Sequence, residues 1–532
     1  MATLDGQLLF GLLVSLAIAA IVAWWLAGRY RKAMLRLMST PTPPQDAAVA
    51  TPMTTVVGAT AAPARFDAVI NRRQNRRLAA VLAGISIVLG LSTSAFELLA
   101  VHTDPGFTLN RWLVLGAVYT WPVVPALGLL WRWSVWRTVG AVAAYMLCLI
   151  PVILLGSNAA QTLVMVTGWL ASTVALPMIS LLGLAASGRI RAIAPLLFPA
   201  AVVLVGTSLV GLAWAASMVD APPPTLLALL DAIGAIPTIL VFIAAPWAIG
   251  IWPVIGVLRA VATAYRHKRF SELAYLFGLF WLVVLIAMAL PSIHSVGLAA
   301  FGIVLVWLWV PIGFALARGW LAPPPAPPTL LVLRVFRRDA AVEALFDAVT
   351  ERWRATGNTV LIAGTDLVTR TLDADDLFVF LSRRLRERFI LQPDDIPRRL
   401  AEFDLTPDHD GRYRINECYC GDATWQGALR ALVAGSHAVL MDLRDFRAEN
   451  GGCRFELGEL SRAAHLRQIV VLFNEHTDRR TAEADLGDAS GRVHWADMTQ
   501  RHRHTDRAVL AALLTPAARP DESGPTQSRG RR

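Results

Sequence analysis

Pro323-Pro324-Pro325-Ala326-Pro327-Pro328 divides this chain of 532 residues into two unlike parts. Before this run the sequence is mainly apolar and carries long uncharged stretches. After it, charged residues are frequent, and short apolar runs alternate with amphipathic ones. Proline-rich segments are stiff, extended and poor at continuing a helix. We therefore interpret 323–328 as a linker between a membrane domain, 1–322, and a water-soluble domain, 329–515.

The composition favours an integral membrane protein. Hydrophobic residues make up 55% of the chain and charged residues 17%, whereas soluble proteins have about 25% charged residues. The net charge of +10 comes largely with arginine clusters beside the apolar stretches, where such residues set orientation, so we expect no nucleic-acid partner. Four cysteines in this length do not indicate a disulfide scaffold and fit a reducing compartment.

The apolar part contains about nine stretches long enough to span a bilayer, which needs about 20 mainly apolar residues. A single span with a kinked continuation around Pro246 and Pro253 accounts for 226–265. The segments 38–64 and 516–532 lack apolar periodicity and are predicted to be disordered. The candidate spans are 7–28, 78–101, 112–131, 137–156, 161–186, 193–216, 226–249, 273–291 and 296–317.

The loops between these spans predict an orientation. Every second loop is basic, namely 29–77, 132–137, 187–191 and 266–269, and the loops between them are neutral or acidic. Basic loops stay in the cytoplasm. We therefore expect a protein of a bacterial inner (plasma) membrane, with its N-terminus outside and its C-terminal domain in the cytoplasm. The lipid bilayer is then an obligatory partner.

Ionisable residues inside spans are costly and usually mark a transport pathway. Glu97 and Asp231 are the two acidic residues in the predicted spans, and both lie near span ends, where we expect them to reach the interface. No internal repeat of the kind found in transporters is visible. An anchor, sensor or oligomerisation module is therefore favoured over a transporter.

The soluble part predicts an α/β fold with a mainly parallel sheet. Apolar runs typical of buried strands alternate with helical periodicity, and this order implies parallel strands joined by crossover helices. A short helix and a hairpin around 413–419 are expected within the interruption 390–420. The predicted strands are 330–336, 359–364, 438–443, 468–473 and 492–495, and the predicted helices are 339–355, 373–389, 424–434 and 453–466.

The densest group of polar residues follows the strand that ends at Asp442. The sequence continues Leu443-Arg444-Asp445-Phe446 and then Glu449-Asn450-Gly451-Gly452-Cys453-Arg454-Phe455-Glu456-Leu457. Paired glycines allow a positive φ and close approach of a ligand, and a helix N-terminus favours phosphates. A carboxylate in the first turn could stabilise an oxocarbenium-like centre, although the helix dipole alone also favours one there.

The stretch from Trp425 to Phe473 resembles the TIR domain. In that family an apolar strand and loop precede a "WC-x-x-E-L" helix start, and a strand of the "IVPI" type follows. Cys453 with Glu456-Leu457 matches the first motif, with Gly452 in place of the tryptophan, and Ile469-Val470-Val471-Leu472 matches the second. The stretch is also similar to nucleoside 2-deoxyribosyltransferases, in which a strand-end Asp and a glycine-bearing loop precede an "E-x-G-x-A" helix.

The resemblance implies a flavodoxin-like or TIR-like domain in a signalling or defence protein that self-associates. Its activity would be cleavage of the N-glycosidic bond of NAD or a related nucleotide, with Glu456 as the catalytic carboxylate. NAD would be the substrate, and no cofactor or metal is expected. A non-catalytic membrane-anchored interaction or sensor protein, and a transporter with a regulatory domain, remain open. The residues expected around the ligand are Asp442, Asp366, Arg334, Trp425, Gly451, Gly452 and Cys453.

Overall fold

The computed structural model describes residues 2–38, 65–103, 106–156, 161–185, 194–218, 222–333, 340–363, 374–421, 423–466, 468–499 and 505–515. The segments 38–64 and 516–532, predicted to be disordered, lie almost entirely outside these ranges. The chain folds as two compact units. We call Met1–Met34, Leu78–Trp320 and Leu367–Leu385 the helical unit, and Leu35–Arg77, Leu321–Asp366 and Arg386–Arg532 the α/β unit.

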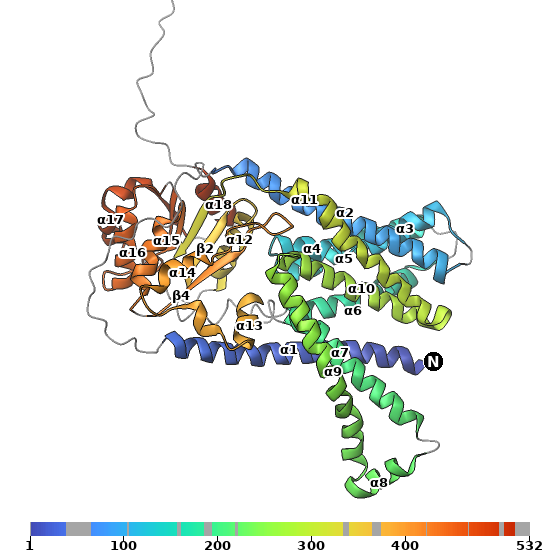
Figure 1. Cartoon of the computed structure of the whole chain (residues 1–532). Coiled ribbons are helices and arrows are strands. Elements are labelled where there is room, and N and C mark those ends of the chain that lie inside the picture. The colour runs from blue at the N-terminus through green and yellow to red at the C-terminus, as the bar shows by residue number, and fades with distance from the viewer. Residues whose placement is uncertain are drawn as a thin grey trace, which may run out of the picture. The chain divides into compact units, whose positions relative to one another are not determined.

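The helical unit consists of long apolar helices (Figure 1). Its α-helices are α1 (Ala2–Met38), α2 (Ala68–Phe96), α3 (Leu109–Tyr119), α4 (Val123–Leu130), α5 (Val135–Gly156), α6 (Leu163–Ala185), α7 (Ala194–Ser217), α8 (Pro224–Ile233), α9 (Ala235–Arg266), α10 (Glu272–Val296) and α11 (Trp309–Leu321). A π-helical turn, η1 (Glu97–Val101), continues α2, and the 3₁₀ segment η2 (Gly297–Leu308) precedes α11.

Within the described residues, eight helices are long and apolar enough to cross a membrane. The predicted span 161–186 corresponds to a further apolar helix, α6, of 23 residues. The segment 235–266 forms one continuous helix, α9, with Pro246 and Pro253 inside it. The predicted start of this span at 226 was wrong, because 224–233 form a separate helix, α8, that ends at Gly234. These helices are compatible with a membrane protein.

The two acidic residues of the predicted spans differ in exposure. Asp231, on α8, is exposed. Glu97, expected at the interface, is only 4% exposed, so the prediction was wrong for this residue. The reason is the π turn at the end of α2, which keeps its first residue inside the packed helices.

Helices α7 and α9 run along each other (Figure 1). The Trp247 indole N–H donates to Ser208 Oγ at 2.6 Å, and a side chain at Gly211 would collide with the Phe242 carbonyl. In membranes the hydrophobic effect does not drive helices together, so helix association depends on close van der Waals packing. Small residues allow it because they let the helix backbones approach each other.

The helix α13 (Ala374–Leu381) lies in the sequence between two strands of the sheet but belongs to the helical unit. Phe378 is packed in a cluster with Leu196, Ala262 and Tyr265, and Phe380 meets the Tyr30 ring edge-on at 5.7 Å. The predicted helix 373–389 is therefore too long. It ends at Leu381, and η4 (Leu385–Arg388) leads into a strand.

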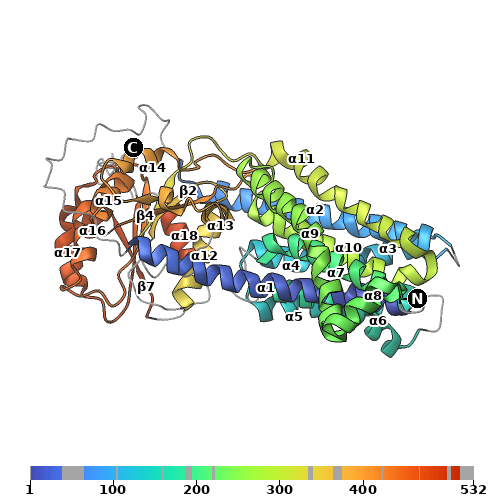
Figure 2. The same ribbon diagram turned by 60° about the horizontal axis from the view of Figure 1, so that its bottom comes forward.

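The α/β unit is built on a seven-stranded parallel sheet of order β3-β4-β2-β1-β5-β6-β7 (Figure 2). The prediction of a mainly parallel sheet is confirmed. The expected hairpin around 413–419 is wrong, because β4 pairs in parallel with β2 and with the edge strand β3. The strands are β1 (Thr329–Leu333), β2 (Asn358–Ala363), β3 (Phe389–Ile390), β4 (Ile415–Cys420), β5 (Ala438–Asp442), β6 (Gln468–Phe473) and β7 (Val493–Asp497).

Helices cover both faces of this sheet. One face packs against α14 (Asp395–Ala401), α15 (Trp425–Ala434), α16 (Gly451–Arg462) and α17 (Arg479–Leu486) through a core that includes Val439, Met441 and Ile469. Alternate strand residues point to the opposite face, where α12 (Ala340–Trp353) and α18 (Thr505–Leu514) lie against the strands and each other. The continuous apolar strands, such as fully buried β5, follow from this double covering.

The order of the strands locates the place where parallel sheets bind ligands. From β1 the chain proceeds to β2 and the strands beyond it, and then returns to β5 on the other side of β1. Ligands of open α/β sheets bind beyond the carboxyl ends of the strands at such a switch point. In the flavodoxin-like order 2-1-3-4-5 one strand lies beyond β1 on that side, whereas here β2, β4 and β3 do.

The start of α2 belongs to the α/β unit. The Asn71 amide donates to the Arg352 carbonyl at 2.9 Å and to Thr356 Oγ1 at 2.8 Å. The Gln74 amide donates to the Leu321 carbonyl at 3.0 Å. The contiguous domain 329–515 expected from composition therefore takes additional packing partners from residues that precede most of the predicted spans.

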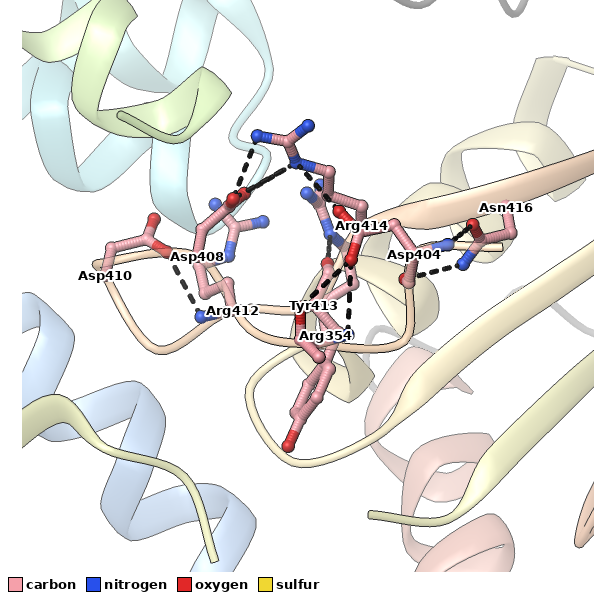
Figure 3. A network of polar contacts seen from close by, with 9 residues as sticks. Arg354, Asp404, Asp408, Asp410, Arg412, Tyr413, Arg414 and Asn416 are labelled. Carbon is pink, nitrogen blue, oxygen red and sulfur yellow. Dashed lines mark hydrogen bonds and ion pairs between the residues drawn. The ribbon is translucent and has the colours of Figure 1, made fainter. Parts of the chain in front are cut away.

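A buried polar network holds the loop between α14 and β4 (Figure 3). Arg412 pairs with Glu351 of α12, and both side chains are at most 6% exposed. The Arg354 Nε–H donates to the Tyr413 carbonyl at 2.6 Å, and Arg414 pairs with Asp408 at 2.9 Å. The segment Asp408-His409-Asp410-Gly411 forms a polar turn, with Gly411 at φ +78°.

Candidate functional site

The strand β5 ends at Asp442, at the switch point of the sheet. Its carboxylate is 4% exposed and is held by the guanidinium of Arg444, with Nε–Oδ1 and Nη2–Oδ2 distances of 2.9 Å each. Such two-pronged pairs are strong and fix geometry. Both oxygens of Asp442 therefore have a partner within the chain, and Arg444 is a site residue that sequence reasoning missed.

The loop after β5 is joined to the loop after β6 at the same edge of the sheet. Asp445 has φ +57°, and it exchanges two hydrogen bonds with the Asn474 side chain, at 3.0 and 3.1 Å. The Thr477 hydroxyl donates to the Leu443 carbonyl at 2.9 Å. The strained backbone at Asp445 is thus maintained by neighbours beyond the next strand.

Replacement of Asn474 by Ala should release this connection. The two hydrogen bonds to Asp445 are lost, at about 1 kcal/mol each, together with those that Asn474 Oδ1 accepts from the His476 N–H and the Thr477 hydroxyl. We therefore expect the loop 443–450 to exchange its amide hydrogens faster, with a loss of at least about 2 kcal/mol of local stability. Hydrogen exchange read by mass spectrometry on the full-length protein measures this. His476→Ala, at an exposed neighbouring position, is the control, and equal exchange in both variants would contradict the connection.

The paired glycines lack the positive φ that the sequence suggested. Gly451 and Gly452 are exposed and are the first residues of α16. Neither has a positive φ, and a side chain at either would meet nothing within 4 Å. The expectation that they permit an unusual backbone conformation was therefore wrong, because the helix begins two residues earlier than its apolar periodicity indicated.

Three of the predicted residues come together at the start of α16. Cys453 is 7% exposed, and its thiol pKa is raised to about 12, first by burial and then by the carboxylates of Glu456 and Asp442. Glu456 is half-buried, and burial raises the pKa of its carboxyl from 4.5 to about 7. The elevated thiol pKa makes Cys453 a poor nucleophile at neutral pH.

Glu456 is the group of this cluster that is best suited to exchange protons at neutral pH. Within the part of the chain that the structure describes, its carboxyl has no hydrogen-bond or ion-pair partner. The nearby acidic side chains are already ion-paired: Asp442 pairs with Arg444, and Glu459 pairs with Arg430 at 3.1 Å. A carboxyl whose pKa lies near neutrality exchanges protons efficiently with a substrate at that pH.

Trp425, expected beside the ligand, is half-buried and packs between two helices. Its ring meets Phe455 of α16 edge-on, with centroids 5.3 Å apart, and it packs against the core beneath the sheet. The Arg430 guanidinium lies over the other ring of this pair, Phe455, at 5.2 Å. Trp425 thus fixes the position of α16, and with it the position of Glu456.

Two predicted ligand residues, Arg334 and Asp366, lie outside the described residues, in the stretches 334–339 and 364–373 that follow β1 and β2 in the sequence. Among the residues that are described, no group of three His, Cys, Asp or Glu side chains could hold a metal ion. Cys418 and Cys420 lie on β4 with their Sγ atoms 3.6 Å apart, and their mutual hydrogen bond and burial raise the pKa of Cys420.

Comparison of the chain with protein-family models, with curated proteins and with solved structures finds no match in any of the three.

Proposed function

We propose that the α/β unit binds NAD or a related nucleotide at the carboxyl edge of its sheet and cleaves the N-glycosidic bond, with Glu456 as the catalytic carboxylate. The observation that carries this proposal is the half-buried Glu456 carboxyl, whose pKa is raised to about 7, at the start of a helix beside the switch point between β1 and β5. The TIR-like motif around Glu456 supports the same assignment.

The proposed reaction is hydrolysis at C1′ of the nicotinamide ribose. The bond from C1′ to the pyridinium nitrogen breaks, its electron pair leaves with neutral nicotinamide, and positive charge develops on the ribose. The Glu456 carboxylate stabilises this oxocarbenium-like centre, as carboxylates do in glycoside hydrolysis. Water then adds to C1′ and gives its proton to Glu456, so the products are nicotinamide, ADP-ribose and one proton.

The helices supply the setting of this proposed activity. The alternation of basic loops supports an anchor in a bacterial inner membrane with the α/β unit in the cytoplasm. Anchoring concentrates these units in two dimensions, which favours the self-association expected of a TIR-like signalling or defence protein.

Nicotinamide release by the full-length protein tests this function. We expect the wild-type protein, densely reconstituted in lipid vesicles with excess NAD, to release nicotinamide at a rate that rises as pH increases through about 7, because the carboxylate is the active form. Glu456→Gln should lose about 100-fold or more of this rate. Glu449→Gln, an exposed carboxylate in the preceding loop, is the matched control.

Two results would count against the proposal in different ways. Wild-type activity in Glu456→Gln would remove Glu456 from the mechanism. The absence of nicotinamide release at both low and high protein density would exclude cleavage and leave the second candidate, a non-catalytic sensor or interaction unit. The closed Asp442–Arg444 pair favours that candidate, because a ribose hydroxyl must displace Arg444 to reach Asp442.

A further inference from the structure

The helical unit contains a buried carboxyl that the proposed function does not use. Glu97 begins the π turn η1, which continues α2 at the end of a candidate span. Its side chain is 5% exposed, and Leu98 beside it is 1% exposed. Buried ionisable residues in membrane helices are costly and mark functional sites, and π turns occur frequently at such sites.

The π turn places a histidine against this carboxyl. The Glu97 Oε2 atom lies 3.2 Å from His102 Nδ1, and the His102 backbone N–H donates to the Glu97 carbonyl at 2.7 Å. In a regular α-helix, residues five apart point about 140° away from each other. The wider turn therefore creates a pair that an uninterrupted helix would separate.

The pair connects the interior of the helical unit to water. The His102 side chain is 61% exposed, whereas that of Glu97 is 5% exposed. An imidazole can take up a proton from water and pass it to a hydrogen-bonded carboxylate. His102 therefore gives protons access to a carboxyl that solvent reaches poorly.

The surroundings of Glu97 favour a bound proton over a bound metal ion. Thr93 lies four residues earlier on the same face of α2 and is completely buried, and its hydroxyl has no hydrogen-bond partner among the described residues. Helix α10, which packs against η1, contributes an apolar cluster that includes Ile293 and contacts Phe96. No set of three metal-ligating side chains occurs in the described chain.

Helix α3 is bound closely to this end of α2. The Trp112 indole N–H donates to the Leu91 carbonyl at 2.9 Å, and the Ser94 hydroxyl donates to the Trp112 carbonyl at 2.8 Å. The ionisable groups that α3 brings into electrostatic reach are Tyr119, which interacts with Glu97, and Arg111, which interacts with Tyr119. The Arg111 guanidinium donates to the Gly106 carbonyl at 3.1 Å.

We propose that Glu97 and His102 form a proton-binding site of the helical unit, in which His102 exchanges protons with water and Glu97 holds the proton in the buried interior. The ligand is the proton itself. This site is independent of the activity proposed for the α/β unit, and it gives the helices a means of responding to acidity on the side that His102 faces.

Infrared difference spectra of the full-length protein in lipid vesicles test the site. All variants are compared in a Glu456→Gln background, because Glu456 also titrates near neutral pH. As the pH is lowered, we expect the protein with native Glu97 and His102 to gain the C=O stretching band of a protonated carboxyl. The band should be lost in Glu97→Gln and kept in Asp231→Asn, the exposed carboxylate of α8. In His102→Gln the band should remain but appear at a different pH.

A full wild-type band in Glu97→Gln, or an unchanged transition in His102→Gln, would overturn the assignment. If Glu97→Gln is not recovered as a folded protein, Glu97→Asp replaces it. The shorter carboxyl should shift the frequency of the same band, and an identical band in Glu97→Asp would also contradict the proposal.

Discussion

Replacement of Glu351 by Ala should lower the free energy of unfolding of the α/β unit by about 3–5 kcal/mol, the usual cost of removing one member of a buried ion pair. Glu351 contacts Arg412 and also Arg354 at 3.5 Å, and all three side chains are at most 6% exposed. Without the Glu351 carboxylate, two positive charges stay in a poorly solvated place close to each other.

We expect this loss of stability to extend to the sheet. Arg354 and Tyr413 exchange backbone and side-chain hydrogen bonds of 2.9 and 2.6 Å, so the network joins the end of α12 to the chain that enters β4 (Figure 3). A loss of this size corresponds to a fall in the melting temperature of roughly 10 °C. Thermal unfolding and hydrogen exchange of the β5 amides, both on the full-length protein, measure it.

A surface pair provides the control for this prediction. Glu483 and Arg479 form an ion pair four residues apart, with side chains 39% and 47% exposed. Glu483→Gln should change stability by less than about 0.5 kcal/mol. Similar effects of the two substitutions would show that the Glu351 network does not hold the α/β unit together.

The second large effect is an increase in stability. Glu456→Gln should make the α/β unit more stable than the wild type above neutral pH, by up to about 3 kcal/mol. The reason is that burial raises the pKa of Glu456 from 4.5 to about 7. The folded protein therefore binds a proton more tightly at Glu456 than the unfolded chain does, and ionisation in the folded state is unfavourable.

The sign of the pH dependence follows from these two values. The contribution of the neutral carboxyl to stability is complete below about pH 4.5 and is lost as pH rises through about 7. The variant lacks this titration, so the difference in melting temperature between wild type and Glu456→Gln should be small at the acidic end and largest above pH 7. The exposed Glu449→Gln should follow the wild type throughout, and a constant difference at all pH values would contradict the raised pKa.

The Glu456→Gln variant also distinguishes the loss of a functional group from the loss of the fold. A variant that is more stable than the wild type and yet inactive has lost a functional group rather than its fold. If Glu456→Gln is both stabilised and unable to release nicotinamide, Glu456 contributes to function at the expense of stability. If it is stabilised and fully active, the buried carboxyl has another role.

Much of the α/β unit could be predicted because its strands are buried on both faces. The apolar runs that became β1, β5 and β6 are recognisable without any context. The strand β4 was mistaken for part of a hairpin because its sequence, Ile-Asn-Glu-Cys-Tyr-Cys, mixes polar with apolar residues. Its parallel pairing depends on a crossover that no local pattern specifies.

The site was predicted in part. Asp442, Cys453 and Glu456 were predictable because a strand end and a helix start at a known sequence distance must meet at one edge of a parallel sheet. The Arg444 pair had a local signal, an arginine two residues after the strand-end aspartate, but residues at this spacing meet only if the loop turns. The burial of Glu97 had no such signal, because nothing in the local sequence shows that α2 ends in a π turn that brings Glu97 and His102 together.

The position of Asn71 has a consequence for how this protein is made. Asn71 bonds to Arg352, 281 residues later in the chain. At synthesis rates of about 5–20 residues per second, roughly 15–60 s pass between the two. During this interval the first turns of α2 leave the ribosome without their permanent neighbours, while the candidate spans that follow are still being inserted. The α/β unit is thus completed by a segment that is synthesised well before the rest of the unit. A fragment that begins at β1 would lack that segment.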